Sequence, residues 1–173
     1  MDATQTVLVV DPDPEFLQWA AHQLSTGDVR VITAENAEEA FKRFCAEKPA
    51  LVITEMRIGT HSGLELLARL RKRDPNALVV VTGALGTTQS VIESMRLGAF
   101  DFVRKEQLPF NLKIIVDAAL KAAAEMRTAE RSQAALTVEQ HEDSIVGQSP
   151  AMQEVFKMIG RISNSDASVM ITG

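Results

Sequence analysis

Cysteine is almost missing from this chain of 173 residues, since Cys45 is the single one. A disulfide framework and a cysteine metal cluster are therefore both excluded. The three histidines, His22, His61 and His141, are scattered without ligand-like spacing, which argues against a zinc site. The opening MDATQTVLVV is no signal peptide, so these absences favour a protein of the reducing cytoplasm.

Long apolar runs and an excess of positive charge are missing as well. The longest apolar run, ALVVV at 77–81, is far too short to cross a bilayer, so no membrane partner is expected. The formal net charge of -5 gives no general attraction to nucleic acid, so direct DNA binding is not expected. The basic stretch RLRKRDP at 69–75 has two interpretations: favourable charges at a helix end, which we prefer, or a phosphate-binding patch.

The sequence does contain a clear alternation of strand and helix patterns. A hydrophobic content of 46% with 24% charged residues fits a globular chain, and the length fits one domain, or one domain and a fragment of another. Three of the five predicted strands are nearly continuous apolar runs, as strands buried on both faces of a parallel sheet are. The predicted strands are 6–10, 29–34, 50–54, 77–82 and 99–103.

Amphipathic helix patterns lie between these strands. Asp13 and Pro14 mark the first helix start, and KPA at 48–50 and DPNA at 74–77 mark helix ends. The pattern predicts an α/β fold, a five-stranded parallel sheet in a three-layer, doubly wound sandwich. The apolar stripes are Phe16, Leu17, Ala20, Ala21 and Leu24; Ala37, Ala40, Phe41, Phe44 and Cys45; Leu64, Leu67 and Ala68; and Val91, Ile92 and Met95.

Four polar residues follow or end the predicted strands. Asp11 comes after the first strand and Glu55 after the third; Thr82 ends the fourth, and Lys105 lies two residues past the fifth. Sheets of this class place their sites outside the carboxyl ends of the strands. Two carboxylates, a hydroxyl and an ammonium at one edge are hard to explain by solvation alone, so we expect a functional site there.

Four stretches carry a resemblance to a known family: VLVVDPDPEF (7–16), LVITEMRIGTHSGLELL (51–67), VVVTGA (79–84) and GAFDFVRK (98–105). With them, residues 5–131 resemble a response-regulator receiver domain of the CheY-like, flavodoxin-like fold. In that family, an acidic pair after the first strand and an aspartate after the third bind Mg²⁺, and that aspartate accepts the phosphoryl group. The resemblance implies that Thr82 and Lys105 contact the phosphoryl oxygens and that Phe102 is the aromatic residue that reorients.

Two departures from the family pattern fall on its chemistry. Pro12 stands where the second acid is expected and offers no side-chain oxygen, which leaves Asp11 as a weak metal ligand. Glu55 replaces the phosphoacceptor and sets its carboxylate roughly 1.5 Å further from the backbone. A misplacement near 1 Å can cost on the order of a hundredfold in rate. We therefore expect no phosphorylation, no Mg²⁺ or other cofactor, and no catalytic residue in this chain.

Glu55 then has two interpretations. In the preferred one it is a built-in partial mimic of the phosphorylated state, because its charge extends towards Lys105 and Thr82. In the other the site is inert and Glu55 forms a simple salt bridge to Lys105. Residues 1–110 would hold the sheet and the first four helices in either case.

The last receiver helix is predicted over 111–136, longer than a receiver needs, because the apolar pattern runs on without a breaker. The excess fits a signalling coiled coil or a solvated helical linker equally well. A boundary follows at 137–144. Residues 145–173 closely resemble the opening of the AAA+ domain of sigma-54-dependent, NtrC-like activators, in which Gly173 would be the first P-loop glycine.

The remainder of that P-loop is absent, so the chain cannot hydrolyse ATP by this motif, and ATP with Mg²⁺ would belong to the missing portion. We interpret the chain as a fragment of a longer regulator. Two functions stay open: a phosphorylation-independent regulatory receiver that controls dimerisation and AAA+ assembly, or a stand-alone adaptor that binds a partner or effector. The first implies a homodimer, sigma-54 RNA polymerase, and a sensor kinase or anti-activator as partners.

Overall fold

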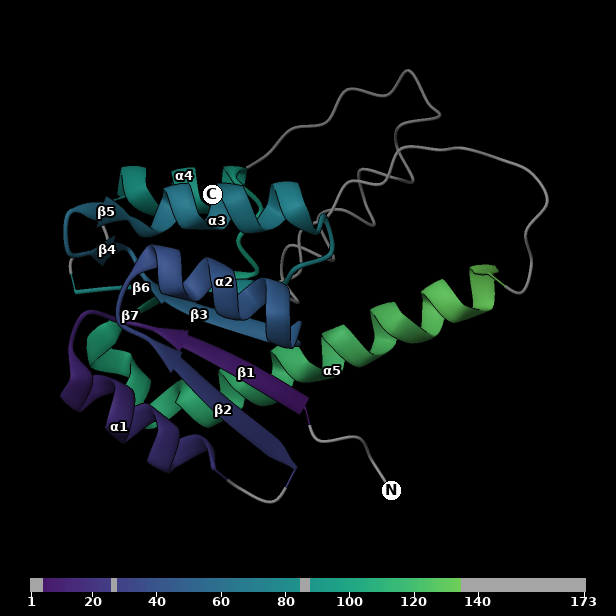
Figure 1. Ribbon diagram of the computed structural model, residues 1–173, viewed down its shortest axis with the longest axis horizontal. Coiled ribbons are helices and arrows are strands. Elements are labelled where there is room, and N and C mark those ends of the chain that lie inside the picture. The colour runs from purple at the N-terminus through teal and green to yellow at the C-terminus, as the bar shows by residue number, and fades with distance from the viewer. Residues whose placement is uncertain (1–4, 26–27, 85–87, 135–173) are drawn as a thin grey trace, which may run out of the picture. The chain divides into compact units, whose positions relative to one another are not determined.

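All five predicted strands are present in one parallel sheet of the computed structural model, which describes residues 5–25, 28–84 and 88–134 (Figure 1). The spatial order is β2-β1-β3-β6-β7, so the three central strands are flanked on both sides. Every neighbouring pair is parallel, and the central strands β3 and β6 are buried along their whole length. The strands are β1 (Gln5–Val10), β2 (Val29–Ala34), β3 (Leu51–Glu55), β6 (Val79–Gly83) and β7 (Asp101–Arg104).

The helices cover both faces of this sheet and confirm the predicted three-layer sandwich. Helices α1 (Pro14–Leu24) and α5 (Leu108–Ala134) share one core cluster with the sheet, and α2 (Ala37–Glu47) and α3 (Gly63–Arg73) share the other. Met95 of α4 (Thr88–Arg96) packs against the second of these clusters. The carboxyl ends of the strands are therefore the open edge at which side chains from different strands can meet.

The predicted helix boundaries are largely confirmed. The side chain of Asp13 accepts a hydrogen bond from the backbone N–H of Glu15, as an N-cap does, and Pro14 is the first residue of α1. Helix α2 ends at Glu47 and α3 at Arg73, just before the two proline-containing segments. The basic stretch at 69–75 thus lies at the end of α3, as the preferred interpretation has it.

Parts of the predicted apolar stripes are wrong. Cys45 and Ala68 are exposed, and Ile92 retains 50% of its surface. Among residues 89–96 of α4, whose burial is described, the fully buried one is Ser94. Its hydroxyl donates to the carbonyl of Val91 and so needs no partner from the core.

A short antiparallel hairpin between β3 and α3 was not predicted. It consists of β4 (Arg57–Ile58) and β5 (His61–Ser62), and Gly59 at its tip has a φ of 61°. Because each strand is two residues long, it leaves no periodic signal in the sequence. The hairpin lies directly beyond Glu55 and shapes the edge of the sheet there.

Helix α5 is long, as expected, and begins at Leu108, three residues before the predicted start. Pro109 is tolerated because the first turn of a helix needs no partner for its N–H. Figure 1 shows the last turns of α5 running on past the sheet, and among the residues up to 129, whose burial is described, Ala123 is the last buried one. The chain divides into two compact units, Met1–Glu142 and Asp143–Gly173, and only the first contains described residues.

The predictions for 135–136, for the boundary at 137–144 and for the AAA+-like segment at 145–173, Gly173 included, lie outside the described residues.

Candidate functional site: an ion-paired cluster at the strand ends

The sheet register brings three of the predicted site residues to one edge. Glu55 is the last residue of β3 and is paired in register with Thr82 of β6. Asp11 directly follows β1, and its backbone N–H still donates to the carbonyl of Ala34 on β2, at 3.1 Å. These positions follow from the strand boundaries alone, so the sequence was sufficient to place them.

Lys105 completes the cluster from the far side of the sheet. It follows β7 directly as the first residue of a 3₁₀ turn, η1 (Lys105–Gln107). Its Nζ lies 2.6 Å from Oδ2 of Asp11 and 3.0 Å from Oε2 of Glu55. One ammonium therefore bridges two carboxylates that come from different strands.

The cluster is mostly shielded from water. The side chain of Asp11 is 0% exposed, that of Glu55 11% and that of Lys105 23%. Charges in such surroundings interact more strongly than exposed ones, because solvent screens them less.

Backbone N–H groups engage the carboxylate oxygens that do not face Lys105. Oδ1 of Asp11 accepts from the N–H of Asp13 at 3.0 Å, and Oε1 of Glu55 accepts from the N–H of Met56 at 2.8 Å. A weaker bond at 3.4 Å reaches Oε1 from the N–H of Arg57. Oδ2 of Asp11 is buried and has the ammonium of Lys105 as an ion-pair partner, although this contact lacks the geometry of a hydrogen bond. Each carboxylate is thus held by a backbone N–H on one oxygen and by Lys105 on the other, and this fixes the direction of both side chains.

The pKa of Lys105 reflects two opposed effects. Burial alone lowers the pKa of this amine, but the hydrogen bonds to Asp11 and Glu55 and the charges of both carboxylates outweigh burial and raise the pKa above its ordinary value. The site therefore holds a fixed positive charge between two acids.

Thr82 and Phe102 lie at this edge on β6 and β7, and Thr82 is the register partner of Glu55. The hydroxyl of Thr82 donates to the carbonyl of Thr54 at 3.3 Å, so the bond from Thr82 to Glu55 that the mimic interpretation anticipated is not formed in this structure. Phe102 is half-buried on β7 and packs against the core cluster under α2 and α3, close to Met56 and Gly83. Their switch roles stay predictions.

Phe16 is the site residue that the sequence did not reveal. Nζ of Lys105 lies 4.6 Å from the centre of the Phe16 ring, within range of a cation–π interaction. The same ring lies 5.5 Å from the ring of Trp19, one turn further along α1. Because Phe16 belongs to the apolar stripe of α1, its spacing alone gave no sign of contact with a charged group.

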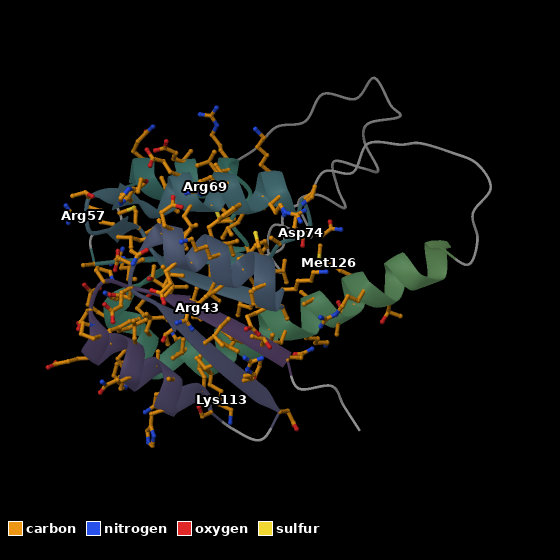
Figure 2. The ribbon with its side chains drawn as sticks, in the orientation of Figure 1. Arg43, Arg57, Arg69, Asp74, Lys113 and Met126 are labelled. Atoms are coloured by element: carbon orange, nitrogen blue, oxygen red, sulfur yellow. The ribbon has the colours of Figure 1, made fainter. Side chains whose placement is uncertain are left out.

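A pocket of about 520 Å³ opens above the cluster. Asp11, Glu55 and Lys105 lie at its wall together with Arg57 and Ser90. Arg57 is exposed on the hairpin strand β4, at the rim of the molecule (Figure 2).

The side chains present do not fit a Mg²⁺ site. Mg²⁺ requires oxygen ligands in near-octahedral geometry, yet Pro12 supplies no side-chain oxygen, and the two carboxylates already face Lys105 and backbone donors. Within 5–25, 28–84 and 88–134, no three acidic, histidine or cysteine side chains are grouped as a metal would need. No chemical step at this site can therefore be assigned to a bound metal.

Comparisons with known proteins agree with the fold. The family model for the response regulator receiver domain matches residues 7–118. The chain is 29% identical over 168 residues to the transcriptional regulator NtrC of Proteus hauseri, covering 96% of this chain and 35% of NtrC. It is 27% identical over 176 residues to the C4-dicarboxylate transport transcriptional regulatory protein DctD of Pseudomonas aeruginosa, covering 99% of this chain and 37% of DctD.

A solved structure gives the same fold. The CheY-like response regulator receiver domain protein of Methanospirillum hungatei superposes with a TM-score of 0.68 at 20% identity, covering 72% of this chain and 99% of that one. The chain thus spans about a third of the length of the curated relatives that it matches. In the part of the chain that the structure describes, no helix is long and apolar enough to span a membrane.

Proposed function

The chain belongs to the response regulator receiver domain family, and from this premise we propose that it is the regulatory receiver of an NtrC-like, sigma-54-dependent transcription activator in a two-component type of pathway. The receiver works without phosphorylation of its third strand. Its output is control of dimerisation and of the assembly of an AAA+ ATPase domain elsewhere in the longer protein. The receiver itself acts as a regulator in the cytoplasm, with a sensor kinase or an anti-activator as its upstream partner.

The observation that supports this proposal is the ion pair between Glu55 and Lys105, with 3.0 Å between Oε2 and Nζ. Glu55 stands where the family has its phosphoacceptor and holds a permanent negative charge against the lysine that would contact a phosphoryl group. A bias of about 1.4 kcal/mol changes the population ratio of a two-state switch tenfold. A charge-assisted hydrogen bond in a shielded site contributes about that much.

Asp11 supports the same interpretation from the other side of Lys105. Its Oδ2 lies closer to Nζ than Glu55 does, at 2.6 Å, so Lys105 has a partner whatever Glu55 does. The role of Glu55 is therefore to orient the ammonium of Lys105 and to hold the backbone at the end of β3. A neutral amide at this position would weaken both contacts.

The first test compares the oligomeric state of residues 1–173 by light scattering across concentration, for the wild type and for Glu55→Gln. We expect a wild-type dimer, and we expect the dissociation constant of Glu55→Gln to rise roughly tenfold, because the amide removes the charge and keeps the shape. Glu47→Gln is the matched control, since Oε2 of Glu47 also lies 3.0 Å from an arginine nitrogen but on the exposed surface. Exposed pairs of this kind contribute little.

Equal masses for the wild type and Glu55→Gln at every concentration would contradict the proposal. The carboxylate would then not bias assembly, and the stand-alone adaptor would become the better interpretation of the chain. A shift of equal size in Glu47→Gln would mean that the effect is one of net charge and not of this site.

A further inference from the structure

The oxygens of Asp11 and Glu55 are divided in a regular way. Each carboxylate gives one oxygen to a backbone N–H and the other to the ammonium of Lys105. A divalent cation that used these carboxylates would first have to displace Nζ from both. A cation that is part of the chain therefore already lies between the two carboxylates.

A second contact keeps the ammonium in that place. Nζ lies 4.6 Å from the centre of the Phe16 ring, and the face of an aromatic ring attracts a cation most strongly where water is largely excluded. If Nζ moved out into the solvent, it would lose this contact together with both ion pairs. The ring thus adds to the cost of clearing the site for a metal.

The position of Phe16 is fixed by the same loop that forms the site. Asp13 caps α1 through the N–H of Glu15, and its own N–H donates to Asp11. Phe16 lies in the first turn of α1 and packs against the core cluster under this helix. The start of α1, the ring and the acidic residue after β1 are therefore held as one unit.

We propose that the ammonium of Lys105 is the permanent cation of this site, that it keeps divalent metal ions out, and that Phe16 is the positioning residue that holds it between Asp11 and Glu55. This inference rests on the proposed function, because a receiver that works without phosphorylation has no need of a metal. The inference goes beyond the proposed function in two ways. It assigns a role to Phe16, which is outside the family's site pattern, and it explains how Asp11 and Glu55 stay paired.

The test titrates the 173-residue chain with Mg²⁺ by calorimetry and with Mn²⁺ by NMR, following paramagnetic broadening of the backbone amides of Met56 and Arg57. We expect no saturable binding by the wild type at millimolar metal. Lys105→Met removes the ammonium and keeps an unbranched apolar side chain, so we expect metal affinity to rise at least tenfold and the two amides to broaden selectively. The affinity should rise because Asp11 and Glu55, once freed from the ammonium, can both bind the metal ion.

Phe16 is tested with three variants. Phe16→Leu keeps an apolar side chain but loses the ring, and at one fixed Mn²⁺ concentration we expect the broadening of the Met56 and Arg57 amides to be roughly two- to fivefold that of the wild type. Phe16→Tyr keeps the ring face and should restore the wild-type behaviour. Phe100→Leu is the matched control, because Phe100 also packs against the core cluster under α1 and α5 as a half-buried residue. It should leave metal binding unchanged.

Three results would overturn the proposal: saturable Mg²⁺ binding by the wild type below the millimolar range, no gain in binding for Lys105→Met, or equal gains for Phe16→Leu and Phe100→Leu. Circular dichroism of each variant separates loss of folding from loss of the ammonium, and the rescue by Phe16→Tyr does the same within the binding data. The readout is independent of assembly. If the wild type excludes metal as expected but Glu55→Gln dimerises like the wild type, the proposed function is refuted and this inference still holds.

Discussion

Lys105 shares one positive charge between two acids, and this determines how the site responds to pH. The pKa of Lys105 lies above its ordinary value of 10.5, since the bonds to Asp11 and Glu55 outweigh burial. A group whose pKa is raised by folding stabilises the folded state fully below its unfolded pKa and loses that contribution as the pH passes through the folded value. The stabilisation by Lys105 is thus complete at neutral pH.

We expect Lys105→Met to lower the free energy of unfolding by about 2 kcal/mol at neutral pH, somewhat less than the loss from breaking a fully buried ion pair. The difference from the wild type should stay constant up to pH 10.5 and shrink only at more alkaline pH. Urea unfolding of both proteins across this range measures it. A difference that already shrinks between neutral pH and the ordinary lysine pKa would contradict the assigned direction.

At the scale of single residues, the sequence predicted well which residues lie at the site and predicted poorly where their side chains point. Asp11, Glu55 and Lys105 meet because strand ends in a parallel sheet converge, and this follows from strand boundaries. The hydroxyl of Thr82 instead donates to Thr54, and this depends on a side-chain rotamer that no pattern encodes. The contact between Phe16 and Lys105 was missed because an aromatic residue in an apolar stripe is indistinguishable from an ordinary core residue.

At the scale of the elements, the junction between β3 and α3 depends on Gly63. The N–H of Gly63 donates to the carbonyl of Met56 at 2.7 Å, and a Cβ at this position would overlap with the backbone oxygen of Glu55. A side chain here would push the start of α3 away from the end of β3. Because the position of a Cβ is set by its own backbone and the oxygen of Glu55 is a backbone atom, no change of side-chain rotamer can relieve the overlap.

Gly63→Ala is therefore expected to lower the free energy of unfolding by about 1–3 kcal/mol, as overpacking typically does. Gly83→Ala is the matched control at the same edge of the sheet, because its Cβ would come no closer than 3.4 Å, to the side chains of Met56 and Phe102. Thermal unfolding followed by circular dichroism measures both. Equal losses in the two variants would show that the overlap at Glu55 is not the cause.

The elements themselves could be predicted where burial leaves a strong pattern. The buried runs of β1, β3 and β6 are apolar on both faces, so their strands were found within two residues at either end. Helix α4 shows the limit, because its innermost residue is Ser94 and Ile92 faces outward. The hairpin β4–β5 left no signal at all, since two-residue strands have no period.

At the scale of the whole molecule, the core formed by the described residues lies within the first compact unit. The two clusters on the faces of the sheet are built from residues between Val7 and Ala123, and the later turns of α5 contribute partial cover by Met126. The chain divides at Glu142. The stability of the receiver should therefore not depend on the residues beyond the end of α5.

We expect a chain ending at Ala134 to unfold in one cooperative transition, with the same midpoint as the receiver transition of the 173-residue chain. Differential scanning calorimetry of both chains measures this. A lost contribution of about 1 kcal/mol would lower the midpoint by roughly 4 °C in a domain of this size. A shift of that size or more would mean that residues after 134 stabilise the receiver.

The ring pair on α1 has one more consequence. Trp19 is the single tryptophan and the chain has no tyrosine. Its ring lies 5.5 Å from the ring of Phe16, which also contacts the ammonium of Lys105. Tryptophan emission from this chain therefore originates two contacts away from the ammonium that pairs with Asp11 and Glu55, and the protein carries its own optical reporter of that site, without a dye or an engineered label.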